Sequence, residues 1–160
     1  MTFASNRVEL RSLAPPLHRC RMPIWVNQSG VIPVLDGQLC MVTSRSGRRW
    51  VFPKGQIDPG HTPSEAALVE AWEEAGLTGI LDPEPIGNYV YEKFERSYHV
   101  LVYRMWVTKA LAVWPESELR EREWMTVPEA LDRVEEHGLR EVLRRAFSNG
   151  TTDRITLARA

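Results

Sequence analysis

Apolar and β-branched residues occur in short runs along most of the chain, and runs of this length predict strands. Asp36-Gly37 separates two of the runs and is a typical hairpin turn signal. Pro53 ends the Trp50-Val51-Phe52 run, because proline lacks the backbone donor that a strand ladder uses. Strands are therefore expected over residues 24–26, 31–35, 39–44, 50–52, 86–91, 98–107 and 123–126.

The clearest helix signal lies between Thr62 and Ala75. The sequence Thr62-Pro63-Ser64-Glu65 combines an N-cap threonine, a proline in the first turn and the glutamate that a capping box requires. Gly76 follows, at the position where a left-handed residue commonly ends a helix. Two further helices are expected over residues 128–134 and 139–147, with Gly138 between them.

The order of these elements favours an α+β fold. Strands and helices interleave without the regular alternation of a doubly wound sheet, so we expect a mixed β-sheet flanked by helices. The length of 160 residues fits one domain, which we place at residues 23–148. Residues 1–22, which contain Ala14-Pro15-Pro16, are interpreted as an N-terminal leader, and residues 149–160 as a C-terminal tail.

Three carboxylates share one face of the helix over residues 62–75, because Glu70, Glu73 and Glu74 are spaced at i, i+3 and i+4. A solvated acidic face is the ordinary alternative. Like charges at this spacing destabilise a helix, however, and no Lys or Arg lies between residues 55 and 80 to offset them. Clustered carboxylates are ligands that suit Mg²⁺ or Mn²⁺. The opposite face is apolar and is expected to enter the core: Leu68, Ala71, Trp72 and Ala75.

The overall charge does not point to a polyanionic macromolecule as a partner. The formal net charge is -1, so no global field favours nucleic acid or an anionic membrane. No apolar run has the length of a membrane span or a signal sequence. Cys20 and Cys40 lack the spacing of a zinc site or a disulfide framework. We therefore expect a cytoplasmic protein that acts on a small molecule; the sequence leaves its oligomeric state open.

Positive charge for a phosphate ligand must then be local. A basic loop, Ser44-Arg45-Ser46-Gly47-Arg48-Arg49, precedes the Trp50 run. Arginine forks match phosphate geometry, and glycine lets the backbone approach a ligand closely. An ordinary polar hairpin loop is the alternative, and for Arg48 and Arg49 individually the two interpretations are even. Lys93 and Arg96 form a second basic pair that could contact a longer polyphosphate. The candidate substrate-binding residues are Ser44, Arg45, Arg49, Lys54 and Gly55.

The stretch from Gly55 to Leu77, GQIDPGHTPSEAALVEAWEEAGL, resembles the Nudix box. The positions that fall in register with it are Gly55, Glu70, Ala71, Glu73, Glu74, Gly76 and Leu77. The preceding Trp-Val-Phe-Pro-Lys sequence is also typical of the Nudix hydrolase family. The resemblance implies an α/β/α sandwich and metal-dependent hydrolysis of a phosphoanhydride bond. It also implies that the catalytic, metal-binding carboxylates are Glu70, Glu73 and Glu74, with the Lys54 carbonyl as a further ligand.

Two positions depart from the Nudix box. His61 stands where the box has its first glutamate, and Val69 stands where it has an arginine. In the family these two residues pair and brace the loop against the helix. Because both are changed here, neither charge would be left buried without a partner. We interpret the change as altered bracing; His61 as an extra metal ligand is the alternative.

The resemblance extends to a substrate class. The sequence SRSGRRWVFPKG is similar to the branch of the family that hydrolyses diphosphoinositol polyphosphates and diadenosine polyphosphates. Oxidised nucleotides and ADP-ribose stay open as substrates, as does the choice of general base among the three glutamates. Glu116 and Glu118 are candidates for a fourth acidic ligand, against the alternative of two surface glutamates. A Nudix-like binding module without turnover is the non-enzymatic alternative, supported by the departures at His61 and Val69.

Overall fold

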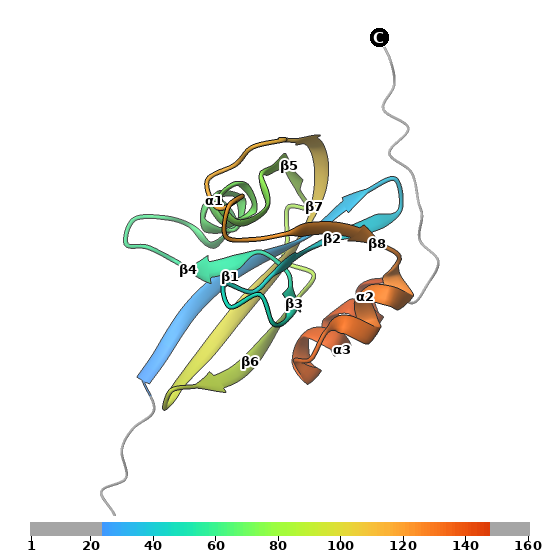
Figure 1. The fold of residues 1–160 in the computed structure, drawn as a ribbon. Helices are drawn as coiled ribbons and strands as arrows, with labels where there is room; N and C mark the ends of the chain where they lie inside the picture. Colours follow the sequence, from blue (N-terminus) through green and yellow to red (C-terminus); the bar gives the residue numbers. More distant parts are fainter. Residues whose placement is uncertain (1–23, 148–160) are drawn as a thin grey trace, which may run out of the picture.

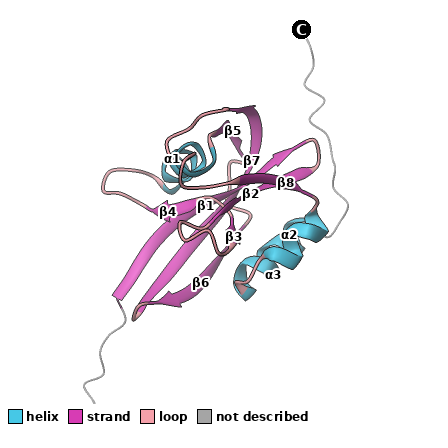
Figure 2. Ribbon diagram, viewed as in Figure 1, coloured by secondary structure: helices cyan, strands magenta, loops and turns pink. Residues whose placement is uncertain are grey.

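The computed structural model describes residues 24–147, which form one eight-stranded sheet with helices on its two faces (Figures 1 and 2). The leader and tail expected at residues 1–22 and 149–160 lie outside the described residues. The strands are β1 (Ile24–Leu35), β2 (Gln38–Thr43), β3 (Trp50–Val51), β4 (Lys54–Gln56), β5 (Leu77–Leu81), β6 (Gly87–Lys93), β7 (Arg96–Ala110) and β8 (Arg122–Met125). The helices are α1 (Pro63–Ala75), α2 (Val127–Arg133) and α3 (His137–Phe147).

The two longest strands, β1 and β7, form the centre of the sheet and run parallel to each other. Their register extends from Ile24 opposite Arg96 to Val34 opposite Trp106. Shorter antiparallel strands complete both sides: β2 and β4 pair with β1, and β5 and β6 pair with β7. Strands β3 and β8 both pair with β2. The mixed sheet expected from the sequence is therefore confirmed.

Helices cover both faces of this sheet. On one face, α1 packs through Ala67, Ala71 and Ala75 against a cluster of buried strand residues. On the other face, α2 and α3 contribute side chains such as Leu139 and Leu143 to a second apolar cluster, and Figure 1 shows the α2–α3 pair on the side of the sheet away from α1. The expected α/β/α sandwich is confirmed. Within residues 24–147, no helix is long and apolar enough to cross a membrane.

The cap signals of α1 are confirmed in detail. Thr62 Oγ1 accepts a hydrogen bond from the Glu65 backbone N–H, and Glu65 Oε2 accepts one from the Thr62 N–H at 2.8 Å. At the other end, Gly76 adopts a left-handed conformation with φ of 64°. A residue with a side chain would be strained at this φ. The hairpin at Asp36-Gly37 is also present, with positive φ at both positions.

The expected core face of α1 is partly wrong. Leu68 and Trp72 are 37% and 43% exposed, whereas Ala67, Ala71 and Ala75 are fully buried. The buried stripe therefore runs at i, i+4 and i+8 through small residues, and the large side chains lie beside it. Alanine allows the helix axis to approach the sheet more closely than leucine or tryptophan would. This close approach brings the acidic residues of α1 near β4.

The sequence pattern does not predict β4 or β5, and it splits β1 in two. Strand β4 has three residues, and it pairs with the polar Gln28–Gly30 part of β1. This pairing makes the polar stretch a strand as well, so β1 is continuous. Gly30 permits the contact, because an added Cβ there would lie 2.6 Å from Lys54 Cβ. Strand β5 contains Gly79, at which its pairing with β7 shifts register.

Candidate active site

The side of α1 that carries Glu70 lies directly against strand β4. An added Cβ on Gly55 would lie 1.8 Å from Glu70 Oε1, so a larger residue would not fit without displacing the carboxylate. Gly55 is expected from the sequence to bind substrate, and the structure places it against Glu70 instead of in open space. The missing side chain lets the strand approach the helix. Glycine therefore sets the spacing between β4 and the acidic face.

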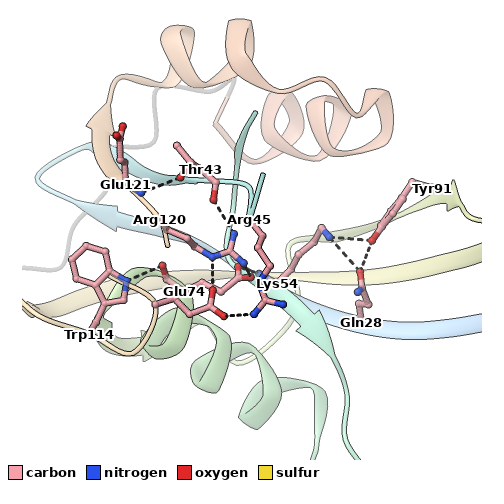
Figure 3. A network of polar contacts seen from close by, with 10 residues as sticks. Gln28, Thr43, Arg45, Lys54, Glu74, Tyr91, Trp114, Arg120 and Glu121 are labelled. Carbon is pink, nitrogen blue, oxygen red and sulfur yellow. Dashed lines mark hydrogen bonds and ion pairs between the residues drawn. The ribbon is translucent and has the colours of Figure 1, made fainter. Parts of the chain in front are cut away.

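Glu74 is the most deeply buried of the three glutamates, and it connects α1 to two other segments (Figure 3). Its Oε2 accepts a hydrogen bond from the Lys54 backbone N–H at 3.1 Å. Its Oε1 accepts a charged hydrogen bond from Arg120 Nη2. Burial raises the pKa of Glu74, while the Arg120 guanidinium and the Lys54 amide act against that rise. Glu74 thus joins β4 and a distant loop to the helix.

Glu70 and Glu73 complete the acidic face and are both partly buried. The pKa of Glu70 is raised to about 7. Burial is the largest cause, because it disfavours the charged form of a carboxyl group. Repulsion by nearby negative charges adds to the shift, in the order Glu74, Glu73 and Glu116. The four carboxylates therefore form one electrostatically coupled group.

Arg120 supplies the positive charge that α1 itself lacks, and no sequence pattern identifies it. Its guanidinium binds Glu74 through Nη2, Glu116 through Nε and the Thr43 carbonyl through Nη1 at 2.8 Å. The side chain is only 8% exposed. Arg120 and Glu74 are 46 positions apart, so no local spacing marks the pair. The only available signal is the unbalanced charge of the helix, which requires a cation from elsewhere.

Of the two candidates for a fourth acidic residue, Glu116 lies at the site and Glu118 is exposed. The backbone N–H of Glu116 donates to the Glu73 carbonyl at 3.1 Å. Trp114 Nε1 donates to the Glu74 carbonyl at the same distance. Both contacts fix the loop between β7 and β8 to the C-terminal part of α1, so Glu116 is held beside the box glutamates.

The basic loop divides its side chains between two regions. Arg45 is 74% exposed, and its Nη2 lies 3.2 Å from Glu116 Oε1, at the acidic site. Arg49 is directed to the α2–α3 connection, where Nη1 lies 3.5 Å from Glu136 Oε1. Ser44 closes the loop locally, since its Oγ accepts from the Arg49 N–H at 3.3 Å. Arg45 is therefore the basic-loop candidate that the structure brings to the carboxylates.

Lys54 makes contacts on both sides of β4. Its backbone N–H meets Glu74, whereas its ammonium lies 3.1 Å from the Tyr91 hydroxyl and 3.4 Å from Gln28 Oε1 (Figure 3). The ammonium also lies 4.8 Å from the centre of the Tyr91 ring. Burial lowers the pKa of Lys54. The side chain is thus separated from the acidic face by the strand that carries it.

The carboxylates suit a divalent cation chemically, although they do not enclose one as placed. Within residues 24–147, no three His, Cys, Asp or Glu side chains lie close enough together to hold a metal ion. Carboxylate oxygens are preferred donors for Mg²⁺ and Mn²⁺, and a cation would relieve the repulsion that raises the pKa of Glu70. The donor set therefore fits, with Glu74 sharing its oxygens with Arg120 and Lys54.

His61 and Val69, the two departures from the box, line one pocket of about 80 Å³ between α1 and the loop before it. The His61 backbone N–H donates to the Asp58 carbonyl at 3.1 Å. The two substituted positions are therefore neighbours in space, as a coupled replacement requires. The remaining residues of the lining are Gln56, Asp58, Ala66, Glu70 and Glu73.

A mixed sheet between α1 and the α2–α3 pair, with the acidic face of α1 beside β4, defines a Nudix-type domain. The NUDIX domain profile matches residues 27–146, and the chain belongs to the Nudix hydrolase family. Nudix hydrolase 13, mitochondrial, of Arabidopsis thaliana is 36% identical over 76% of this chain and 67% of that protein. Diphosphoinositol polyphosphate phosphohydrolase 3-beta of Bos taurus is 35% identical, over 64% of this chain and 62% of that protein. The chain thus spans about two thirds of the length of these relatives.

Solved structures share the fold at lower sequence identity. The MutT protein from Methanosarcina mazei Go1 has a TM-score of 0.67 at 18% identity, covering 81% of this chain and 98% of that one. A binary complex of the C. elegans Ap4A hydrolase has a TM-score of 0.62 at 22% identity, covering 78% and 98%. These likenesses establish the architecture of the domain.

The raised pKa of Glu70 predicts a pH dependence of stability for protein stripped of divalent ions by chelation. The folded state keeps the Glu70 proton between pH 4.5 and about 7, whereas the unfolded chain releases it. Stability from this group is therefore full below the lower value and is lost as pH rises toward the upper one. Urea denaturation across this range should show the decline. Glu70→Gln should reduce it, whereas the exposed control Glu92→Gln should not; equal slopes for all three proteins would contradict the assignment.

The pocket shared by His61 and Val69 predicts that the two positions are energetically coupled. His61→Glu or Val69→Arg alone should help little or destabilise, because each introduces a charge without its partner. The double substitution should be better tolerated than the sum of the two, with a coupling of roughly 0.5 to 3 kcal/mol. A double-mutant cycle on the free energy of unfolding measures this quantity. Strict additivity would show that the two positions are independent.

Proposed function

We propose that the chain is a divalent-metal-dependent hydrolase that cleaves a phosphoanhydride bond in a compound whose diphosphate is linked to another group. The observation that carries the proposal is the coupled group of carboxylates on and beside α1, which consists of Glu70, Glu73, Glu74 and Glu116. Such crowding costs stability without a cation. Family membership supports the same reaction. We place the domain that would perform it at residues 23–148.

Mg²⁺ or Mn²⁺, when bound, neutralises phosphate oxygens and lowers the pKa of a water. The ions would be held by Glu70, Glu73 and Glu74, with the Lys54 carbonyl and Glu116 as further oxygen donors. One of the three glutamates of α1 would accept the proton of the attacking water. The contact of Gly55 with Glu70 and that of the Lys54 amide with Glu74 keep the carboxylates in place during this step.

Phosphate groups would be bound from the basic side of the site. Arg45 is exposed and already paired with a carboxylate of the acidic group, so its guanidinium can contact an anion beside the metal ligands. Lys54 offers an ammonium on the far side of β4. Lys93, two positions after Tyr91, pairs with Arg96 at the end of the β6–β7 hairpin. The phosphate groups of a longer substrate could extend along this series of cations and contact them in turn.

For the substrate class we favour a diphosphoinositol polyphosphate or a diadenosine polyphosphate. The similarity of the basic-loop sequence to that branch supports this choice, as do the printed names of the bovine relative and the C. elegans structure. Oxidised nucleotides and ADP-ribose are the competing substrates. We also propose a cytoplasmic location, because the spacing of Cys20 and Cys40 does not indicate a disulfide framework, although plant relatives are named mitochondrial or chloroplastic.

The proposed reaction predicts phosphate release that requires both metal and the box glutamates. A panel of nucleoside and inositol diphosphate derivatives should be hydrolysed with Mg²⁺ or Mn²⁺ and left intact with a chelator. Glu73→Gln should lower turnover by about a hundredfold or more, since even outer-shell partners of metal ligands cost about 10- to 100-fold. The exposed control Glu84→Gln should retain activity. Tight ligand binding without release of any product would favour the binding module instead.

The position of Arg45 predicts an effect that depends on the length of the phosphate chain. Arg45→Gln should raise KM by roughly 10-fold for a long polyphosphate substrate, on the scale of one charge-assisted hydrogen bond of about 1.5 kcal/mol. The effect on a simple diphosphate should be smaller. Arg48→Gln changes an exposed arginine of the same loop and serves as the matched control. Equal losses for long and short substrates would mean that Arg45 supports the loop alone.

A further inference from the structure

Arg120 lies outside the Nudix box, and all three nitrogen atoms of its guanidinium make contacts at the acidic site. Nη2 binds Glu74, Nε binds Glu116, and Nη1 donates to the Thr43 carbonyl at 2.8 Å. The side chains of Arg120, Glu74 and Glu116 are 8%, 12% and 20% exposed. Figure 3 shows Arg120 between Thr43 of β2 and Glu74 of α1. The guanidinium is therefore a largely desolvated cation bound by two carboxylates.

The same carboxylates are the ones that the proposed function assigns to a divalent ion. Glu74 has both oxygens engaged, one by Arg120 and the other by the Lys54 amide at 3.1 Å. A metal ion needs lone pairs of these oxygens, and its charge would lie next to that of the guanidinium. Like charges repel more strongly in a partly buried site than in water, because the effective dielectric constant is lower. Arg120 and the ion would therefore compete for Glu74, because they share its oxygens and repel each other.

The loop that carries Arg120 does not depend on the guanidinium for its position. Trp114 Nε1 binds the Glu74 carbonyl, and the Glu116 N–H binds the Glu73 carbonyl. At the end of the loop, the Glu121 N–H donates to Thr43 Oγ1 at 3.0 Å. These contacts would hold the loop in place without the ion pairs of Arg120. The charge of Arg120 can therefore be removed without detaching the segment.

We propose that Arg120 is a built-in competitor of the divalent ion, which holds Glu74 and Glu116 until the ion takes over at least one of them. The inference rests on the proposed function, because that function supplies the metal. Arg120 holds the two carboxylates close together at the expense of metal affinity. On release, its guanidinium lies beside the bound ion, where a phosphate group of the substrate is the available anion. Metal binding and phosphate binding are then coupled through one side chain.

Calorimetric titration of chelator-treated protein with Mn²⁺, in the absence of substrate, tests the competition. Arg120→Gln should bind Mn²⁺ about tenfold more tightly than the unchanged protein, within the 5- to 150-fold range typical of coupled sites. Arg120→Lys keeps the charge and should stay closer to the unchanged protein. Arg122→Gln is the matched control, since Arg122 binds the backbone carbonyls of Ala75 and Leu111 and no carboxylate of the site. Its Mn²⁺ affinity should not change.

Weaker or equal Mn²⁺ binding by Arg120→Gln would overturn the inference, because a simple structural brace predicts that result. If that variant does not fold, the unchanged protein provides the test through the NMR signal of the Arg120 Nε–H group during a Mg²⁺ titration. The signal should shift as the ion pair with Glu116 or Glu74 opens. An unmoved signal, with backbone amides of α1 responding to Mg²⁺, would also overturn it. Failure of the unchanged protein to bind either ion would instead count against the proposed function.

Discussion

The close approach of α1 to β1 and β4 is the constraint on which the rest of the site depends. A stripe of alanines lets the helix pack near the sheet, and Gly55 and Gly30 remove the side chains that would otherwise separate the layers. Bulky residues at these positions would push the helix outward, because a packed interior has little free volume to absorb them. The acidic residues then lie within reach of the β4 backbone. Small residues thereby determine where the charged ones are.

The second organising feature is the balance of charge around that helix. Three glutamates on one face require compensation, which α1 cannot provide within its own sequence. Compensation comes from Arg120 and the Lys54 amide at Glu74, and Glu70 is left with a pKa of about 7. The site is therefore neutralised unevenly. One carboxylate is satisfied by the protein, and its neighbour one turn earlier is the group with the most to gain from an external cation.

Local signals explain which parts of the structure could be predicted from the sequence. The caps of α1 and the Asp36-Gly37 turn depend on residues a few positions apart, and they are confirmed. Arg120 could not be found in this way, because its partner is 46 positions distant and no spacing links them. The exposure of Leu68 and Trp72 could not be predicted either, since residue size alone does not reveal how closely a helix packs. Strand β4 is too short to have a pattern of its own and exists through its pairing with β1.

Lys54 has a further consequence because its main chain and side chain serve different faces of the same strand. Its amide is part of the acidic compartment, and its ammonium is part of an aromatic one that includes Tyr91, itself stacked on Tyr98 with ring centres 4.8 Å apart. Strand β4 is thus all that separates the two groups of contacts at this residue. A substitution at Lys54 therefore removes the ammonium from the aromatic side, whereas the backbone N–H that binds Glu74 is kept by every residue except proline.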